Sequence, residues 1–257
     1  MRDRKTAEEI ELIRESSLLV GKTLGEVGNH IRPGVKTIEL DRIAEEFIRD
    51  HGAIPGFKGY NGFPYTLCIS VNDQVVHGMP GEKVLNDGDI ASVDCGVLMN
   101  GYYGDSAYTF PVGDVNEEVL ALMKRTIEAL YLGIEQAIAG NRVGDIGHSI
   151  QKYVEGFGYS VVRDLVGHGL GKNLHEKPEV PNYGKRGSGA MLKEGMVLAI
   201  EPMINLGTRK IIQERDGWTI RTADGRPSAH YEHDVVVRKE KAEILSTFEY
   251  IESSIND

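Results

Sequence analysis

The chain of 257 residues is long enough for one large domain or two small ones, and its composition, 40% hydrophobic and 26% charged, is typical of globular proteins. The net charge of −10 argues against sequence-specific nucleic-acid binding, which needs clustered positive charge. The sequence has no apolar run of about 20 residues, no apolar signal segment after its charged N-terminus, and only two cysteines. These features predict a cytoplasmic protein that does not contact membranes.

Apolar residues recur at helical spacing near the N-terminus and predict a first helix over residues 7–27. After the break "RPG", a second helix is expected to be capped by Thr37 and to run to about residue 52. Strands are predicted at 66–72 and 90–110. Two more helices are predicted at about 116–139, ended by Gly140, and at about 145–157, and strands with Gly-rich loops follow from residue 160.

The order helix, helix, strands occurs twice along the chain. "VKTI" at 35–38 and "VGDI" at 143–146 open the second helix of each set, at an offset of 108 residues. Because no low-complexity linker separates the sets, we predict one α+β domain over residues 1–257, with helices on one face of a mainly antiparallel sheet. Its two related halves would span about 7–112 and 115–250.

An aspartate stands at each end of the segment "DCGVLMNGYYGD", residues 94–105. Asn100-Gly101 is a strong hairpin signal, because a type I′ turn needs positive φ at both central positions. The numbers of paired residues then sum to 201, so that Asp94 and Asp105 become diagonal neighbours on one face of the hairpin. Two carboxylates in an apolar strand pair need a counter-cation, and a metal ion fits; the competing interpretation is two unrelated surface aspartates.

Three further segments place polar side chains in apolar or Gly-rich sequence. "GHGLGKNLHEKP" carries His168 and His175 on an expected loop, Glu201 ends the apolar run "MVLAI", and Glu232 precedes the β-branched run "VVV". Oxygen-rich ligation with one imidazole suits Mn²⁺, Fe²⁺, Co²⁺ or Zn²⁺, and a bridging carboxylate allows two ions. The sequence has neither EF-hand spacing nor the four cysteines of a structural zinc site.

The ordered set of acids and histidine, with "VVHGMPG" upstream and "GHGLGKNLHEKP" between them, resembles the methionine aminopeptidases over about residues 7–250. The resemblance implies the duplicated pita-bread fold. It is closest to the bacterial type I form, because no long insertion separates His175 from Glu201. It also implies two divalent metal ions per chain, of cobalt, manganese, iron, zinc or nickel.

Position by position, the resemblance assigns five residues to these ions. Asp94 would hold one ion, and His168 and Glu201 the other. Asp105 and Glu232 would bridge the two. Glu201 is also the implied acid–base group, because it can accept the proton of a water at the metal.

The substrate contacts implied by the resemblance are two histidines and an apolar pocket. His77 and His175 match the histidines that contact the substrate and its tetrahedral intermediate. The implied methionine pocket consists of Tyr60, Phe63, Cys68, Met203 and Trp218, although the same apolar residues could form ordinary core. Leu174 stands where an aromatic residue is frequent in the family.

The implied reaction is hydrolysis of the bond after an initiator methionine when the second residue is small. Its substrates would be the N-termini of nascent polypeptides, near the ribosome, and the enzyme would be a monomer. An X-Pro aminopeptidase or prolidase shares the five ligands but usually carries an additional N-terminal domain. A non-catalytic binding protein on this fold and a structural zinc or calcium protein also compete with this interpretation, but neither needs the full ligand set plus two extra histidines.

Overall fold

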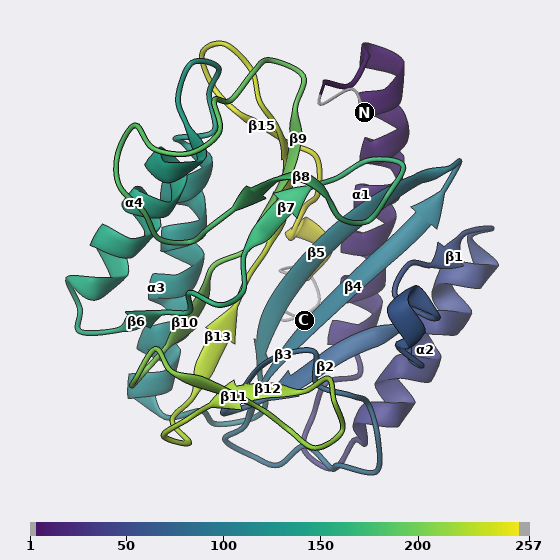
Figure 1. Cartoon of the computed structure of the whole chain (residues 1–257). Helices are drawn as coiled ribbons and strands as arrows, with labels where there is room; N and C mark the ends of the chain where they lie inside the picture. The colour runs from purple at the N-terminus through teal and green to yellow at the C-terminus, as the bar shows by residue number, and fades with distance from the viewer. Residues whose placement is uncertain (1–3, 252–257) are drawn as a thin grey trace.

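Four α-helices frame the part of the chain that the computed structural model describes, residues 4–251. They are α1 (Ala7–Gly28), α2 (Thr37–Asp50), α3 (Glu117–Ile134) and α4 (Val143–Glu155), and a short 3₁₀ turn, η1, covers Tyr60–Gly62. Strands lie between the helix pair α1–α2 and the helix pair α3–α4 (Figure 1). The predicted domain ends, residues 1 and 257, fall outside the described residues.

All pairings between the named strands are antiparallel, which confirms the predicted α+β class. The first half holds β1 (Ile54–Pro55), β2 (Leu67–Val71), β3 (Gln74–Val76), β4 (Ile90–Met99) and β5 (Tyr102–Pro111). The second half holds β6 (Ser160–Val161), β7 (Gly167–Gly169), β8 (Glu176–Val180), β9 (Val197–Ile200), β10 (Met203–Asn205), β11 (Ile211–Gln213), β12 (Ile220–Thr222), β13 (Ser228–His230), β14 (His233–Val236) and β15 (Glu243–Ile244). The largest sheet has the order β15-β14-β9-β7-β8.

The predicted hairpin is confirmed residue by residue. Asn100 and Gly101 both have positive φ, 53° and 78°, and join β4 to β5. Asp94 pairs with Ala107 and Asp105 pairs with Gly96, so the two aspartates share one face of the hairpin. Cys95 points to the other face, where it is fully buried in the main core.

Two predicted helix ends are wrong because tertiary contacts replace the local signals. Thr37 is not the cap of α2 but its first residue, and its hydroxyl instead donates to the Gly81 carbonyl and accepts from the Gly81 N–H. Helix α3 ends at Ile134, five residues before the predicted end. The chain leaves the helix there because Ala139 N–H bonds to the carbonyl of Arg238, beside a bridge between Ile138 and Arg238.

The entries of α2 and α4 repeat one hydrogen-bond pattern. Thr37 N–H and Ile38 N–H bond to the carbonyls of Lys83 and Gly81, and Val143 N–H and Gly144 N–H bond to those of Ala190 and Ser188. The donor residues at the two helix starts are therefore 106 positions apart in the sequence, whereas the V-x-x-I spacing predicted 108. The residues whose carbonyls accept these bonds are 107 positions apart, and Asp94 and Glu201 are also 107 positions apart.

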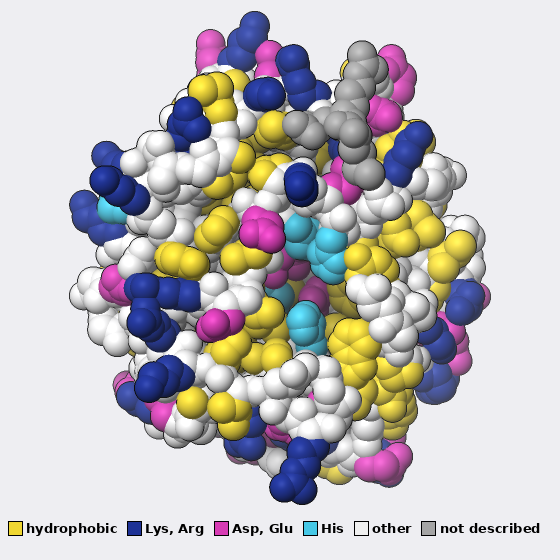
Figure 2. Space-filling model, in the orientation of Figure 1, with side chains coloured by type: hydrophobic (Ala, Val, Ile, Leu, Met, Phe, Trp, Pro, Cys, Tyr) yellow, Lys and Arg dark blue, Asp and Glu magenta, His cyan; other side chains and the backbone are white. Residues whose placement is uncertain are grey.

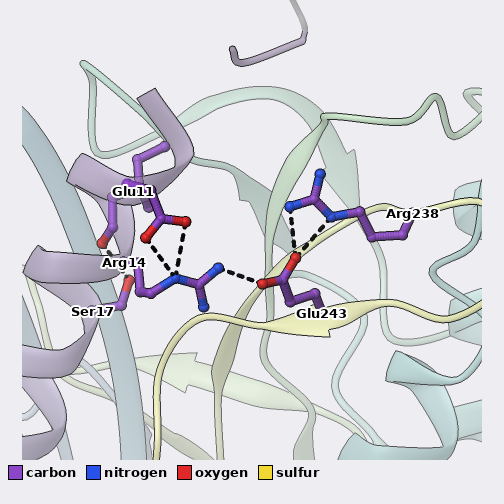
Figure 3. Close-up of polar contacts among 6 residues, drawn as sticks. Glu11, Arg14, Ser17, Arg238 and Glu243 are labelled. Carbon is purple, nitrogen blue, oxygen red and sulfur yellow. Dashed lines mark hydrogen bonds and ion pairs between the residues drawn. The ribbon is translucent and has the colours of Figure 1, made fainter. Parts of the chain in front are cut away.

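The core is one large apolar cluster between the helices and the strands, to which both halves contribute. At the surface, Arg14 of α1 contacts Glu11 and Glu243, and Arg238 pairs with Glu243 at 2.6 Å (Figure 3). Such partly exposed pairs typically contribute no more than about 1 kcal/mol each, so the buried cluster dominates the stability. None of the helices within residues 4–251 has the length and apolarity to cross a membrane.

Candidate active site

A cavity of about 580 Å³ opens on one face of the molecule and is lined by residues of both halves. Histidine side chains gather at this hollow, with acidic side chains beside and beneath them (Figure 2). The structure brings together all the site residues that the sequence predicts, since each lines the cavity: Tyr60, Phe63, Cys68, His77, Asp94, Asp105, His168, His175, Glu201, Met203, Trp218 and Glu232.

The acids converge at the inner wall of this cavity. Asp94 and Asp105 come from β4 and β5, Glu201 directly follows β9, and Glu232 directly precedes β14. The ligand atoms of Asp105, His168 and Glu232 lie within 4.8 Å of one another. His168 Nε2 is 3.8 Å from Asp105 Oδ2 and 3.5 Å from Glu201 Oε1, so one imidazole and several carboxylates face a common point.

The carboxylate oxygens at this point suit a metal ion. Asp94 Oδ1, Asp105 Oδ1 and Glu232 Oε1 are buried and have no hydrogen-bond partner among the described residues. Burial raises the pKa of Asp94 to about 7, and burial together with the charges of the neighbouring acids raises the pKa values of Asp105, Glu201 and Glu232 well above their usual range. A divalent cation would offset this repulsion and occupy the unpartnered oxygens, so the residues fit a metal centre.

His168 is oriented as a metal ligand. Burial lowers its pKa to about 4, so its imidazole is neutral at neutral pH. Its Nδ1–H donates to the carbonyl oxygen of Gly169 at 2.9 Å, which leaves Nε2 as the acceptor nitrogen toward the acids. This outward hydrogen bond is the arrangement that fixes the tautomer of metal-bound histidines.

Two further histidines stand at the cavity without facing the acids as closely. His77 has φ of 58°, a conformation that costs a non-glycine residue about 1–3 kcal/mol and that is concentrated at functional sites. His175 is held through Nδ1 by the hydroxyl of Tyr60 at 2.8 Å. Burial lowers the pKa values of both histidines, so both rings are neutral at neutral pH.

The remaining wall of the cavity is apolar. Phe63 and Trp218 pack edge to face, with ring centroids 5.1 Å apart. Cys68 lies opposite Asp94 in the strand pairing, and burial raises its pKa well above the usual value, so its sulfur is a neutral thiol. Leu174 is 1% exposed and completes this wall as an aliphatic side chain. The wall can therefore accept an apolar side chain.

Two buried residues at the site carried no clear signal in the sequence. His230 lines the cavity and has an unpartnered Nε2 atom, 3.9 Å from Glu201 Oε2. Asp234 Oδ2 accepts hydrogen bonds from the N–H of Asp105 at 2.8 Å and from the hydroxyl of Ser17 at 2.7 Å, and thereby holds the backbone of a candidate ligand. Their alternation with Glu232 in "HYEHD" was the available signal, but similar alternation occurs in many ordinary strands.

Comparison with known proteins gives the chain a family. Residues 11–239 match the model of metallopeptidase family M24. A methionine aminopeptidase of Clostridium perfringens is 54% identical over 242 residues, which cover 94% of this chain and 97% of the relative. The crystal structure of a methionine aminopeptidase from Rickettsia prowazekii superposes with a TM-score of 0.94 at 41% identity, over 96% of this chain and all of that one.

A prolidase from Pyrococcus furiosus has a TM-score of 0.78 at 24% identity, and this chain covers 66% of its length. That likeness concerns the fold alone. The matches to M24 and to the methionine aminopeptidases extend over nearly the whole chain, and they agree with the acid-rich cavity. The chain belongs to metallopeptidase family M24 and, within it, to the methionine aminopeptidases.

Proposed function

We propose that this protein is a metal-dependent hydrolase that removes the N-terminal methionine from polypeptides whose second residue is small. The observation that carries the proposal is the convergence of buried, unpartnered carboxylate oxygens beside an apolar wall in one cavity. The first feature suits activation of water and of a peptide carbonyl, and the second suits an unbranched apolar side chain. Identities near 50% to methionine aminopeptidases support the same assignment.

Five side chains would hold two divalent ions. Asp94 would bind one, His168 and Glu201 the other, and Asp105 and Glu232 would bridge them. When bound, the ions supply Lewis acidity, which lowers the pKa of a coordinated water and polarises the scissile carbonyl. The unpartnered oxygens of Asp94, Asp105 and Glu232 support these roles.

The other polar side chains would handle protons and developing charge. Glu201 would accept the proton of the attacking water and return it to the leaving amine. His77 and His175 would hydrogen-bond the carbonyl oxygen and the nitrogen of the scissile amide as charge develops on them. The hydrogen bond from Tyr60 to His175 would keep that ring in place during the reaction.

The pocket would select methionine by shape and polarity. Phe63, Cys68, Met203 and Trp218 offer contacts that a thioether side chain fills, because sulfur packs favourably on aromatic edges. The buried carboxylates would also favour the free α-amine of an N-terminus. We further propose that the enzyme acts as a monomer in the cytoplasm on nascent chains near the ribosome, without binding specific nucleic-acid sequences or membranes.

The test is cleavage of matched tripeptides by the metal-loaded protein. Met-Ala-Ser and Met-Pro-Ser should release methionine, whereas Leu-Ala-Ser, Ala-Pro-Ser and Met-Lys-Ser should remain intact. The products are quantified by chromatography, with the chelated protein as the control. Comparable turnover of Leu-Ala-Ser, or a strict demand for proline at the second position, would contradict the proposal and favour a general or an X-Pro aminopeptidase.

A further inference from the structure

His230 is a buried histidine at the cavity that the proposed mechanism does not use. It ends β13, is 1% exposed, and lines the cavity. Its Nε2 atom has no hydrogen-bond partner among the described residues. An unpartnered buried polar atom destabilises the folded state, so its presence at the cavity indicates a role that offsets this cost.

The backbone of His230 is fixed by the strand that carries Asp105. Thr109 of β5 uses one hydroxyl for two contacts: it accepts from the His230 N–H at 3.0 Å and donates to the His230 carbonyl oxygen at 2.7 Å. On the other side, β13 pairs with β10 so that His230 lies opposite Met203. Both side chains line the cavity, so the imidazole is directed inward by two neighbouring strands.

The carboxylate of Glu201 lies between two imidazoles. Its Oε1 atom is 3.5 Å from Nε2 of His168, and its Oε2 atom is 3.9 Å from Nε2 of His230. The hydrogen bond from Asn182 reaches only the backbone carbonyl of Glu201. Because the terminal torsion of a glutamate has a broad energy well, the two oxygens can exchange places unless an outside group holds them.

We propose that His230 is a positioning residue for Glu201, whose Oε2 atom accepts a hydrogen bond from His230 Nε2–H while Oε1 stays directed toward His168. A small movement of either side chain closes the separation of 3.9 Å to hydrogen-bond length. The inference rests on the proposed function, in which Glu201 both binds an ion and moves a proton. Fixing the plane of the carboxylate assigns one oxygen to each task.

The experiment compares two variants of similar size at saturating divalent metal. His230→Met removes the donor and should lower kcat by about 10–100-fold, the loss typical of groups that orient a ligand, with little change in KM. His230→Gln keeps an N–H donor of similar reach and should restore most of kcat. Metal content by elemental analysis should equal that of the parent in both. Equal losses in the two variants, or no loss in His230→Met, would overturn the inference.

Loss of an equivalent of metal from His230→Met would also overturn the inference, because His230 would then be a ligand. A double-mutant cycle combines His230→Met with Glu201→Gln and measures metal affinity by calorimetry as well as kcat. If His230 acts through Glu201, adding His230→Met to Glu201→Gln should change neither quantity further. An additive loss would contradict the proposal. If His230→Met does not fold, His230→Asn is used instead, because the shorter asparagine amide should not reach the carboxylate of Glu201.

His233 provides the matched control, because it is the other buried histidine beside Glu232. Its Nδ1 bonds to Ser246 Oγ at 2.7 Å, and its ring stacks on Phe248 instead of lining the cavity. His233→Gln should lower the melting temperature with kcat close to that of the parent. Failure of the proposed function would appear in the parent protein, which would not release methionine, whereas failure of this inference would appear only in the His230 variants.

Discussion

The two halves of the molecule supply their acids in different ways. In the first half, Asp94 and Asp105 stand on the continuous hairpin β4–β5, whose pairing is unbroken over ten residues of each strand. In the second half, β9 pairs with β14, but the chain between Glu201 and Glu232 leaves this pair to form β10 to β13. The first pair of acids therefore depends on one two-residue turn, and the second on a long excursion.

This difference places part of the substrate wall between the two acids of the second half. The excursion between the second pair of acids carries Met203, Trp218 and His230, which line the cavity. The halves meet where Glu232 N–H bonds to the carbonyl of Ala107 and Ser106 Oγ donates to the carbonyl of Glu232. The hairpin thus supplies only acids, whereas the excursion adds Met203 and Trp218 to the substrate wall, where they join Phe63 and Cys68 of the first half.

The largest effect should come from removing one of the two proposed bridging acids, Asp105 from the first half or Glu232 from the second. Asp105→Asn and Glu232→Gln should each reduce metal content and lower kcat by more than about 1000-fold, because losing a ligand to both ions should exceed the loss of one hydrogen-bond donor to an oxyanion, about 100–1000-fold. Elemental analysis and turnover of Met-Ala-Ser measure both quantities, with the exposed Glu240→Gln as the control. Full metal content in either variant would show that the two halves do not share the ions.

A somewhat smaller effect is expected for the two substrate histidines, one from each half. His77→Ala and His175→Ala should lower kcat by about 100–1000-fold, as is typical for loss of a donor to an oxyanion, while KM changes less. Metal content should stay at the parent value, and His148→Ala on α4 is the control. If either variant loses an equivalent of metal, that histidine is a ligand.

The smallest effect concerns the pH dependence of stability in the metal-free protein. Folding raises the pKa values of Asp94 and Asp234 to about 7, so the stability they contribute is complete at low pH and is lost as the pH rises through about 7. His168 and His230, with pKa values lowered to about 4 and about 3, act in the opposite sense, but only below about pH 6.5.

From pH 6.5 to 8 the carboxyl groups therefore dominate the pH dependence of stability. The melting temperature of the chelated protein should fall by several degrees over this range, at about 2–4 °C for each kcal/mol of unfolding free energy lost. Calorimetry with and without metal measures this fall. Bound cations should flatten it, because they stabilise the ionised carboxylates, and Asp94→Asn should reduce it in the chelated protein. A melting temperature that rises with pH in the chelated protein would contradict the assignment of a buried, acid-rich centre.

The sequence by itself determined the features that depend on neighbours in the chain. Asn100-Gly101 adopts positive φ because of local sterics, so the shared face of Asp94 and Asp105 followed from counting along two strands. The first helix was predictable from the helical spacing of its apolar residues, and the capping box of Thr6 and Glu9 that begins α1 is an equally local feature. The identities of the acids and histidines, in order, carried the resemblance to the family.

Only the tertiary structure decided which side chains meet across long separations. Nothing near His230 in the sequence indicates that it faces Glu201, because Thr109 of β5 sets its direction. The hydrogen bond between Asp234 and the N–H of Asp105 joins residues 129 positions apart. The early end of α3 likewise depends on the carbonyl of Arg238. Such contacts form when the halves pack together, and they can outweigh the modest local preferences that sequence patterns report.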